Sequence, residues 1–530
     1  MVTSTQRWLS AGCGLGLMLV ALGCEQLVGA DFDVHPLPGS SSGSGSGGGG
    51  TGNGGIGGTG GSVEGAGGHG GSGAGGGDAT ATVRWARRVG GSSDRDMGGR
   101  PVFDSAGNLY LVGATHGMID LDPSAPVVAQ GLTDLWVARM APDGTPTWVR
   151  VFESCTGCRV WPTAVLLDGD AGLIVAGTFS AGEQAGGMLH VGDTDLVAAG
   201  WSDGFLVALD FDGELRWAKS YGGPADEWFR GLARGDDGAL YVVGHTSQGE
   251  SGDPDIGFGP WPPAYGGTSN AFVARFSTEG EPVWGRPYGV PGGASYMEMI
   301  SVAVHGDLLV TAGNAGAPLE VDGIAVDPPS TPALMVTGHA LADGVAAWAH
   351  GYAPSQPAGK YGMYGSAVAI EPQTGSALVT GRISDAVDFG NGVSSDAGPR
   401  TAMSLRIDTA SGNATSVALL CEDQSWGRAV VFDEGAPLLG GDFSGLLGSS
   451  PSGFGSPLGD AFVLRDDGAG SWSNHFSASN GSPSEVDHIG VLPGAGSVAI
   501  VGKFKDQLPI GGNELTSAGG EDVFIAVLDP

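Results

Sequence analysis

The sequence predicts an all-β protein, and three observations support this prediction. Gly makes up 101 of the 530 residues and Pro 31, whereas charged residues make up only 15 %. Beyond the first 25 residues, no long stretch places apolar side chains at helical spacing. Short apolar runs bounded by Asp-Gly, Gly-Asn or Pro recur instead, which is typical of antiparallel strands joined by tight turns.

The N-terminal segment has the features of an export signal. Arg7 precedes the apolar run WLSAGCGLGLMLVALG, which has the length of a signal-peptide core and is too short to span a membrane comfortably. The run ends in VALGC, which resembles the lipobox of bacterial lipoproteins, although Ala21 stands where that family usually has Leu. We predict a signal peptide over 1–23 and lipidation at Cys24. The alternative is an ordinary secretory signal that is cleaved nearby.

A tether is predicted between this anchor and the folded body. After a short segment at 24–38, residues 39–77 are almost entirely Gly, Ser and Thr, which bury too little apolar area to offset their ordering entropy. Such a flexible chain reaches about 35 Å. We predict a disordered linker over 39–82 and membrane contact through the lipid anchor only. The expected location is the outer membrane or cell surface, with the periplasm or the medium as alternatives.

From residue 83 the chain repeats itself seven times, with four strand-like runs in each repeat. One run ends in a Gly, a second opens with Asp or Asn two residues before a large apolar side chain, a third carries a Trp, and a fourth precedes the Gly run. The Gly residues recur every 60 to 69 positions, at Gly113, Gly177, Gly244, Gly313, Gly381, Gly441 and Gly502. Six of the seven Trp runs carry the Trp, at Trp85, Trp148, Trp217, Trp284, Trp348 and Trp472, and TSVALL from Thr415 takes the remaining place.

The order of these runs predicts how the fold closes. The first Trp run, TVRWARRVG, precedes any copy of the other runs, and the last repeat ends at VFIAVLDP without a Trp run. A bare strand edge is a liability that a closed ring avoids. We therefore predict a seven-bladed β-propeller of four-stranded antiparallel blades over 83–530, in which Val83 to Val89 is the outer strand of the last blade.

The repeat text is similar to a known bacterial sequence repeat. GGPADEWFRGLARGDDGALYVVGHTS resembles the tandem β-propeller repeat of secreted and lipid-anchored bacterial proteins, with its W-x-x-x-x-G-G, D-x-x-G-N-x-Y-V-x-G and D-A-F-V-A signatures. The resemblance covers 83–530 and is weaker in the middle, where Leu334 and Met403 follow Pro-Ala and Thr-Ala instead of Asp-Ala. It implies the propeller fold and a place outside the cytoplasm, and it implies no reaction.

The prominent repeated residues have structural explanations. We expect each Trp to fill the wedge between neighbouring blades, and each Gly of the second run to permit a bulge or a close approach. The Asp-Gly pairs at Gly144, Gly213, Gly238 and Gly344 are expected to form turns that need positive φ. Calcium binding needs four or more oxygen ligands in a fixed register, and these loops do not supply them. No metal and no cofactor are predicted.

Two cysteines form a C-x-x-C pair, Cys155 and Cys158. A zinc site needs two further ligands, and the sequence offers no second pair nearby. In an oxidising envelope we therefore predict a local disulfide between Cys155 and Cys158. Cys421 is then an odd thiol, expected to be buried.

The acidic composition excludes one class of partner. The chain has 57 acidic and 23 basic residues, a net charge of −34, so phosphate backbones are repelled. We predict no nucleic-acid partner. We find no catalytic set in the sequence, although a site assembled in the central funnel from several blades stays open. The candidate ligand-contact loop is 252–267, where Trp261 and Tyr265 are expected to be exposed, unless the loop folds back over its own blade.

These observations favour a binding or scaffold module for an unknown envelope protein or polysaccharide, expected to be a monomer. One alternative is a propeller enzyme that acts on a carbohydrate or lactone in the funnel, which a buried His or carboxylate cluster with perturbed titration would favour. Another is a scaffold for outer-membrane assembly. Propellers of that kind and quinoproteins pair A-x-D-x-x-T-G with a Trp, and ALDFDGELRW keeps only part of that pattern.

Overall fold

The computed structural model describes the body of the chain, within the compact unit His69–Pro530. The described residues are 81–91, 96–121, 127–180, 186–247, 252–261, 269–289, 296–355, 362–396, 400–420, 424–447, 454–466, 471–478 and 483–530. The expected signal peptide, Cys24, the segment 24–38, the linker up to residue 80, Tyr265 and Cys421 lie outside them. Among these residues, no helix is long and apolar enough to cross a membrane.

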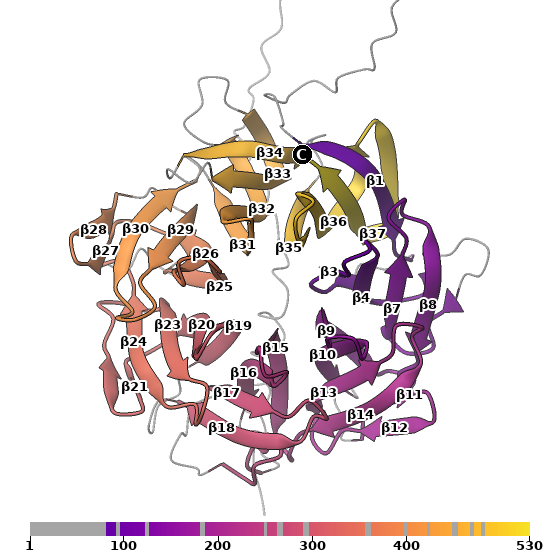
Figure 1. Ribbon diagram of the computed structural model, residues 1–530, viewed down its shortest axis with the longest axis horizontal. Helices are drawn as coiled ribbons and strands as arrows, with labels where there is room; N and C mark the ends of the chain where they lie inside the picture. Colours follow the sequence, from indigo (N-terminus) through magenta and orange to yellow (C-terminus); the bar gives the residue numbers. More distant parts are fainter. Residues whose placement is uncertain are drawn as a thin grey trace, which may run out of the picture. The chain divides into compact units, whose positions relative to one another are not determined.

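Within this unit, four-stranded antiparallel blades stand around a central axis, and the chain is a seven-bladed β-propeller (Figure 1). From the inside outward, the first three blades are β2 (Met97–Gly98) with β3 (Val102–Phe103), β4 (Leu109–Thr115), β7 (Asp134–Met140), β8 (Pro146–Phe152); β9 (Arg159–Leu167), β10 (Leu173–Ser180), β13 (Ser202–Leu209), β14 (Leu215–Tyr221); and β15 (Asp226–Arg234), β16 (Leu240–Ser247), β17 (Asn270–Phe276), β18 (Pro282–Tyr288).

The other four blades follow the same order. They are β19 (Met297–His305), β20 (Leu308–Ala315), β23 (Ala333–Ala340), β24 (Ala346–Tyr352); β25 (Tyr364–Ile370), β26 (Ala377–Ile383), β29 (Thr401–Ile407), β30 (Ala414–Leu419); β31 (Ser425–Asp433), β32 (Ala436–Leu447), β33 (Phe454–Asp466), β34 (Trp472–Ala478); and β35 (Ser484–Leu492), β36 (Ser497–Ile510), β37 (Asn513–Asp529), β1 (Thr82–Val89).

Short hairpins join the second and third strands of four blades. They are β5 (Met118–Ile119) with β6 (Val127–Val128), β11 (Met188–Val191) with β12 (Thr194–Val197), β21 (Leu319–Val321) with β22 (Ile324–Val326), and β27 (Val387–Gly390) with β28 (Val393–Ser395).

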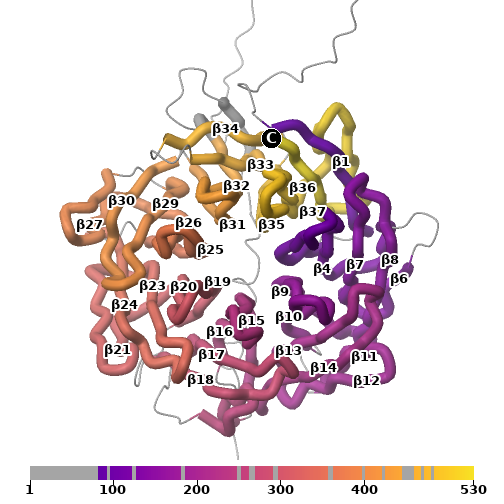
Figure 2. Tube along the Cα trace, viewed as in Figure 1, coloured from indigo at the N-terminus to yellow at the C-terminus, as the bar shows by residue number. Residues whose placement is uncertain are grey.

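The ring closes as the sequence predicted. Strand β1 pairs antiparallel with β37, from Thr82 opposite Asp529 to Val89 opposite Val523. Figure 2 shows this indigo strand beside the yellow C-terminal strands. Arg88 ion-pairs with the buried Asp522 at 2.7 Å, which fastens the two ends of the body together. The propeller therefore begins at Thr82, one residue before the predicted boundary.

In six blades the recurring Gly of the second strand faces a bulge in the inner strand, as predicted, and in the first blade Gly113 faces Gly98 of the short strand β2. In the third blade, Phe229 lies opposite Gly244 and Gly231 opposite Val243, so Arg230 is the extra residue. A Cβ atom on Gly244 would lie 1.8 Å from the carbonyl oxygen of Trp228. The second strand is thus required to carry Gly at this position.

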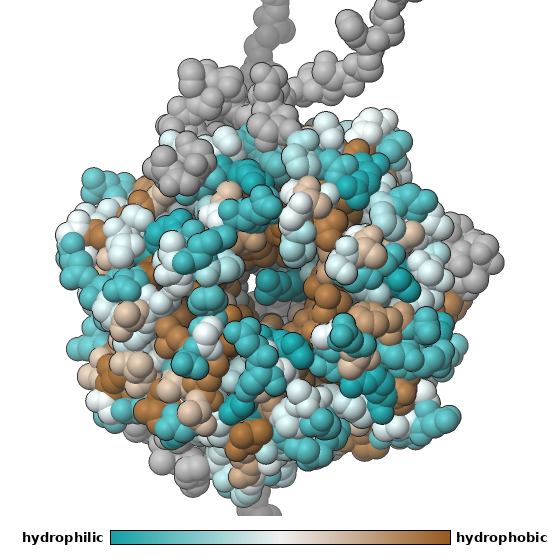
Figure 3. All heavy atoms as spheres, in the orientation of Figure 1, coloured by the Kyte–Doolittle hydropathy of each residue, from teal (hydrophilic) through white to brown (hydrophobic). Residues whose placement is uncertain are grey.

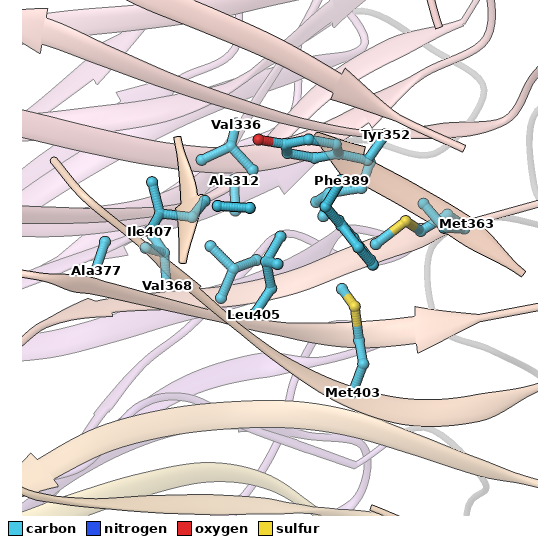
Figure 4. Packing of buried hydrophobic residues seen from close by; sticks show 14 of the residues in the cluster. Ala312, Val336, Tyr352, Met363, Val368, Ala377, Phe389, Met403, Leu405 and Ile407 are labelled. Carbon is cyan, nitrogen blue, oxygen red and sulfur yellow. The ribbon is translucent and has the colours of Figure 1, made fainter. Parts of the chain in front are cut away.

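Apolar residues fill the space between neighbouring blades. Figure 4 shows one such cluster, in which residues of the fourth and fifth blades meet, among them Val336, Tyr352, Val368 and Leu405. The outer-strand Trp residues close these wedges at the rim. Trp284, for example, is half-buried, and its Nε1 donates a hydrogen bond to the Leu341 carbonyl of the next blade at 3.1 Å.

The Asp-Gly turns belong to the same contact. Gly344 has a φ of +74°, and a Cβ atom there would lie 2.5 Å from the Trp284 ring. Positive φ is confirmed at Gly144, Gly213 and Gly238 as well. Among the described residues no group of three or more His, Cys, Asp or Glu side chains is placed to hold a metal ion.

Candidate binding site at the mouth of the central channel

The inner strands line a channel on the axis of the ring. Residues of all seven blades line a cavity of about 110 Å³ there. Figure 3 shows one face of the molecule, hollowed at its centre and rimmed by both hydrophilic and hydrophobic residues. Because no single repeat supplies more than a few of these residues, the site exists only in the closed ring.

One position recurs at the start of every inner strand. On the inner strand, this position comes just before the residue that pairs with the recurring Gly of the second strand. Its own partner on the second strand is the residue just after that Gly. We call these seven positions the mouth ring: Met97, Trp161, Trp228, Glu298, Tyr364, Trp426 and Glu485. Their partners on the second strands are Ala114, Thr178, His245, Asn314, Arg382, Asp442 and Lys503.

The bulges place a second set of side chains on the channel wall. In six inner strands the extra residue of the bulge lines the cavity. A bulge changes the direction of this side chain, which in a regular strand would point to one face of the sheet. These residues are Thr163, Arg230, Ile300, Ser366, Arg428 and Asp487. In the first blade Gly99 cannot contribute a side chain, and Arg100 lines the cavity instead.

Aromatic side chains of the second and third blades meet at the mouth. Trp161 and Trp228 are both half-buried, and their ring centroids lie 4.7 Å apart. Trp228 also stacks on His245 of its own blade, with an interplanar angle of 4°. The guanidinium carbon of Arg230 lies 5.5 Å from the Trp228 ring centroid. The mouth therefore presents flat apolar surface directly beside a positive charge.

Trp426, in the sixth blade, lies against two guanidinium groups. The Cζ atoms of Arg382 and Arg428 lie 4.2 and 4.8 Å from its ring centroid. Its Nε1 donates a hydrogen bond to Ser366 Oγ at 2.7 Å, which fixes the ring. Stacked guanidinium groups lose little further freedom when they bind an acceptor, so this arrangement is preorganised.

Carboxylates surround one of these arginines. Arg428 forms ion pairs with Asp442 at 2.7 Å, Glu485 at 2.6 Å and Asp487 at 3.5 Å. Burial raises the pKa of Glu485, against the effect of Arg428. Burial also acts on Asp487, but Lys503 and Arg428 outweigh it and hold the pKa of that carboxyl below its usual value. Two neighbouring carboxyls thus have pKa values shifted in opposite directions.

Other cations at the mouth lack such compensation. None of the ion pairs among the described residues includes Arg100 or Arg382, and Arg230 has only Glu298 at 3.6 Å. The buried Nε–H groups of Arg230 and Arg382 have no hydrogen-bond acceptor among the described residues. In a chain with 57 acidic and 23 basic residues, this is a local concentration of positive charge.

The predicted contact loop does not form an exposed aromatic surface. Trp261 is only 7 % exposed, and its ring centroid lies 5.9 Å from that of Phe272 in the third blade. The prediction that Trp261 is exposed is therefore wrong, because the loop folds back over its own blade and buries the indole. Tyr265 lies outside the described residues.

Cys155 and Cys158 lie side by side across a tight turn, with their Cα atoms 5.0 Å apart and Cys158 buried, a spacing that a disulfide can bridge. The disulfide between them stays a prediction. The channel site is not directly visible in the sequence, because its residues come from repeats hundreds of positions apart. The available signal was that the mouth-ring position and the bulge position of the inner strand both differ from repeat to repeat.

No family model matches the sequence, and no curated protein matches it. Solved structures share the fold. A chain of the mitotic checkpoint complex is 9 % identical, with a TM-score of 0.42 over 86 % of this chain and 93 % of that chain. Quinohemoprotein alcohol dehydrogenase from Comamonas testosteroni is 11 % identical, with a TM-score of 0.40 over 84 % and 76 %. Virginiamycin B lyase from Staphylococcus aureus is 9 % identical, with a TM-score of 0.38 over 84 % and 99 %.

Proposed function

We propose that the chain is an exported, lipid-anchored β-propeller that binds an envelope polysaccharide or protein at its channel mouth. The observation that carries this proposal is the mouth ring. Its seven equivalent positions hold three Trp, one Tyr, two Glu and one Met, each next to the inner-strand segment that lines the cavity. Aromatic residues and arginines dominate the binding energy of recognition surfaces.

Binding at the mouth is tested with the full chain, immobilised and exposed separately to purified envelope polysaccharide and to envelope proteins. Replacing both Trp161 and Trp228 by Ala should weaken capture about tenfold or more, since aromatic anchors commonly supply over 1 kcal/mol each. The matched control is Trp201→Ala, which removes an indole that is 51 % exposed and lies outside the mouth ring. Equal capture by the double variant and the control would contradict the proposed site.

The lipid anchor is tested independently of the ligand. Cys24→Ala should move the chain from the detergent phase to the aqueous phase in a phase-separation assay, because one lipid modification and its apolar chains are lost. A variant that stays in the detergent phase would refute lipidation at Cys24.

A second candidate function is favoured by Glu485 and Asp487. Carboxyls with pKa values moved apart are the arrangement expected of an acid and a base, and both lie at the channel mouth beside Arg428. This supports a propeller enzyme that acts on a carbohydrate or lactone. In a turnover screen, Glu485→Gln should abolish any activity that is found. Activity that survives this change would remove Glu485 from the mechanism.

A further inference from the structure

The inner wall of the channel carries three arginines from three different blades. Arg100, Arg230 and Arg428 come from the first, third and sixth blades and line the same cavity of about 110 Å³. Like charges that converge in a partly buried site repel one another and lose solvation. In a chain of net charge −34, acidic side chains are abundant, yet among the described residues Asp487 is the one carboxylate that lines this cavity with them.

We infer that the ligand of the mouth is an acidic polysaccharide, whose carboxylate groups enter the channel between these arginines. This inference rests on the proposed function and deepens it by naming the ligand class. A guanidinium presents a rigid planar fork that matches a carboxylate with two parallel hydrogen bonds. The Nε–H of Arg230 and that of Arg382 are buried donors without an acceptor, and a ligand carboxylate supplies one.

The charge of the site suits a monoanionic group. Arg428 and Lys503 lie among the three carboxyls of Asp442, Glu485 and Asp487, so this group adds no net positive charge to the cavity. Arg100 and Arg230 remain, and Arg230 is partly balanced by Glu298 at 3.6 Å. One ligand carboxylate neutralises the positive charge that remains on Arg100 and Arg230. A dianionic group would instead leave an excess negative charge beside Asp487.

The surroundings of the arginines favour a sugar over an acidic peptide. The Trp161 and Trp228 pair offers flat apolar rings at the mouth, against which the C–H face of a sugar ring can lie. Ser366 Oγ accepts from Trp426, and Ser301 Oγ accepts from the Val368 amide, so both hydroxyl protons stay available for sugar oxygens.

The cavity is too small for a whole sugar chain. Sites that enclose a small molecule usually measure about 300 to 1,000 Å³, against about 110 Å³ here. The structure therefore assigns the cavity to the carboxylate edge of one residue, while the rest of the polysaccharide lies across the mouth ring.

The test is isothermal titration of the full chain in mild detergent with three probes: oligogalacturonate, its fully methyl-esterified form, and oligoglutamate. The two sugars share a backbone, and the ester replaces each carboxylate by an uncharged methyl ester. We expect oligogalacturonate to bind at least about tenfold more tightly than the ester, and its affinity to fall with added salt. Oligoglutamate should bind weakly, since it has no sugar face for the Trp pair.

Two variants locate the binding. Arg100→Gln changes an exposed side chain that takes part in no ion pair among the described residues, so it should weaken oligogalacturonate about tenfold without changing the melting temperature. Arg84→Gln removes the same charge from the outer strand β1, where Arg84 pairs with Asp529, and should leave binding unchanged.

The outcomes separate this inference from the proposed function. Equal binding of the ester and the free acid would overturn the inference and leave a polysaccharide-binding propeller. Oligoglutamate binding more tightly than oligogalacturonate would overturn the sugar class. Absence of binding to all three probes, or binding unaffected by Arg100→Gln, would overturn the arginine site.

Discussion

The outer strands and the inner strands of the same blades differ in what they keep constant. On four outer strands, β1, β8, β14 and β18, a Trp is followed two residues later by Arg or Lys, and this basic side chain donates a hydrogen bond to the turn of the next blade. Arg286 Nε, for instance, donates to the Asp343 carbonyl at 3.0 Å, beside the bond from Trp284. The same residues recur on these strands because the same contact is made at these four blade junctions.

Along the inner strands, the recurring backbone feature is a bulge, and the side chains around it vary. The mouth ring holds Trp, Tyr, Glu and Met at equivalent positions. Since contacts between the blades at the outer strands hold the ring together, the residues at the mouth-ring positions can differ from blade to blade. The comparison teaches that in this repeat the constant residues build the ring, and that the variable positions of the inner strands, where we propose that a ligand binds, are not needed to hold it together.

The largest expected effect comes from opening the ring. Deleting Thr82 to Gly90 removes β1, which supplies the outer strand of the last blade, and leaves the edge of β37 bare. We expect cooperative loss of structure, measured by near-UV circular dichroism and thermal unfolding. An equally long deletion at 40–48 in the predicted linker is the control and should change neither. An unchanged melting temperature after removal of β1 would refute closure by this strand.

The next effect tests the constant feature of the inner strands. Gly244→Ala should lower the free energy of unfolding by about 3 kcal/mol, because its methyl group would meet the Trp228 carbonyl and the backbone cannot yield easily. Gly459→Ala is the matched control, since a Cβ atom there meets nothing closer than 4.0 Å. Urea unfolding of the two variants measures the difference. Equal losses would show that the bulge needs no Gly.

A buried carboxyl beside the mouth predicts a pH dependence. Glu227 is fully buried next to Trp228, and burial together with the charge of Asp203 raises its pKa to about 9. The folded state then holds a proton that the unfolded state releases near its ordinary pKa. Between the unfolded-state pKa of this carboxyl and pH 9, the free energy of unfolding therefore decreases as the pH rises. The decrease is up to about 1.4 kcal/mol per pH unit.

The variant Glu227→Gln removes this titration. Its melting temperature should change less than that of the unmodified chain between pH 7 and 9, while the two should behave alike in their response to salt. Thermal unfolding across this range is the measurement. Parallel curves for the two proteins would show that Glu227 does not hold its proton in the folded state.

The smallest effect sharpens the account of the outer strands. Trp284 Nε1 donates a hydrogen bond to the next blade, whereas Trp217 Nε1 is buried with no acceptor among the described residues. Replacing each by Phe keeps the aromatic ring and removes the N–H group. Trp284→Phe should cost about 1 kcal/mol more than Trp217→Phe. Equal costs in chemical unfolding would mean that packing alone holds the blades together.

Much of the fold was predictable because each repeat shows the same local structural requirements in its sequence. The recurring Gly, the Asp-Gly turns and the order of the Trp runs gave the seven blades and the closing strand β1. These are short-range requirements that seven copies make visible. Of the weaker middle repeats, the fifth was aligned correctly, since Met403 faces Gly381 as Phe272 faces Gly244, but in the fourth blade Met335 and not Leu334 faces the recurring Gly.

The site was less predictable because it depends on distances between repeats. Arg100 and Arg428 are far apart in the sequence and meet only when the ring is closed. The acidic composition argued against a nucleic-acid partner, and it does not reveal that several of the few basic residues lie at the channel. Trp261 was misjudged for a related reason, since neighbouring prolines do not reveal that Phe272 lies beneath the loop.

The most direct test of the division between ring and mouth compares Arg100→Gln with Trp284→Ala in the same two assays. We predict that Arg100→Gln loses oligogalacturonate binding and keeps the melting temperature. Trp284→Ala should lose about 2 to 3 kcal/mol of stability, because a half-buried Trp is removed, and should keep its binding at temperatures where it is folded. Loss of both properties in both variants would contradict the claim that outer strands build the ring and the mouth recognises the ligand.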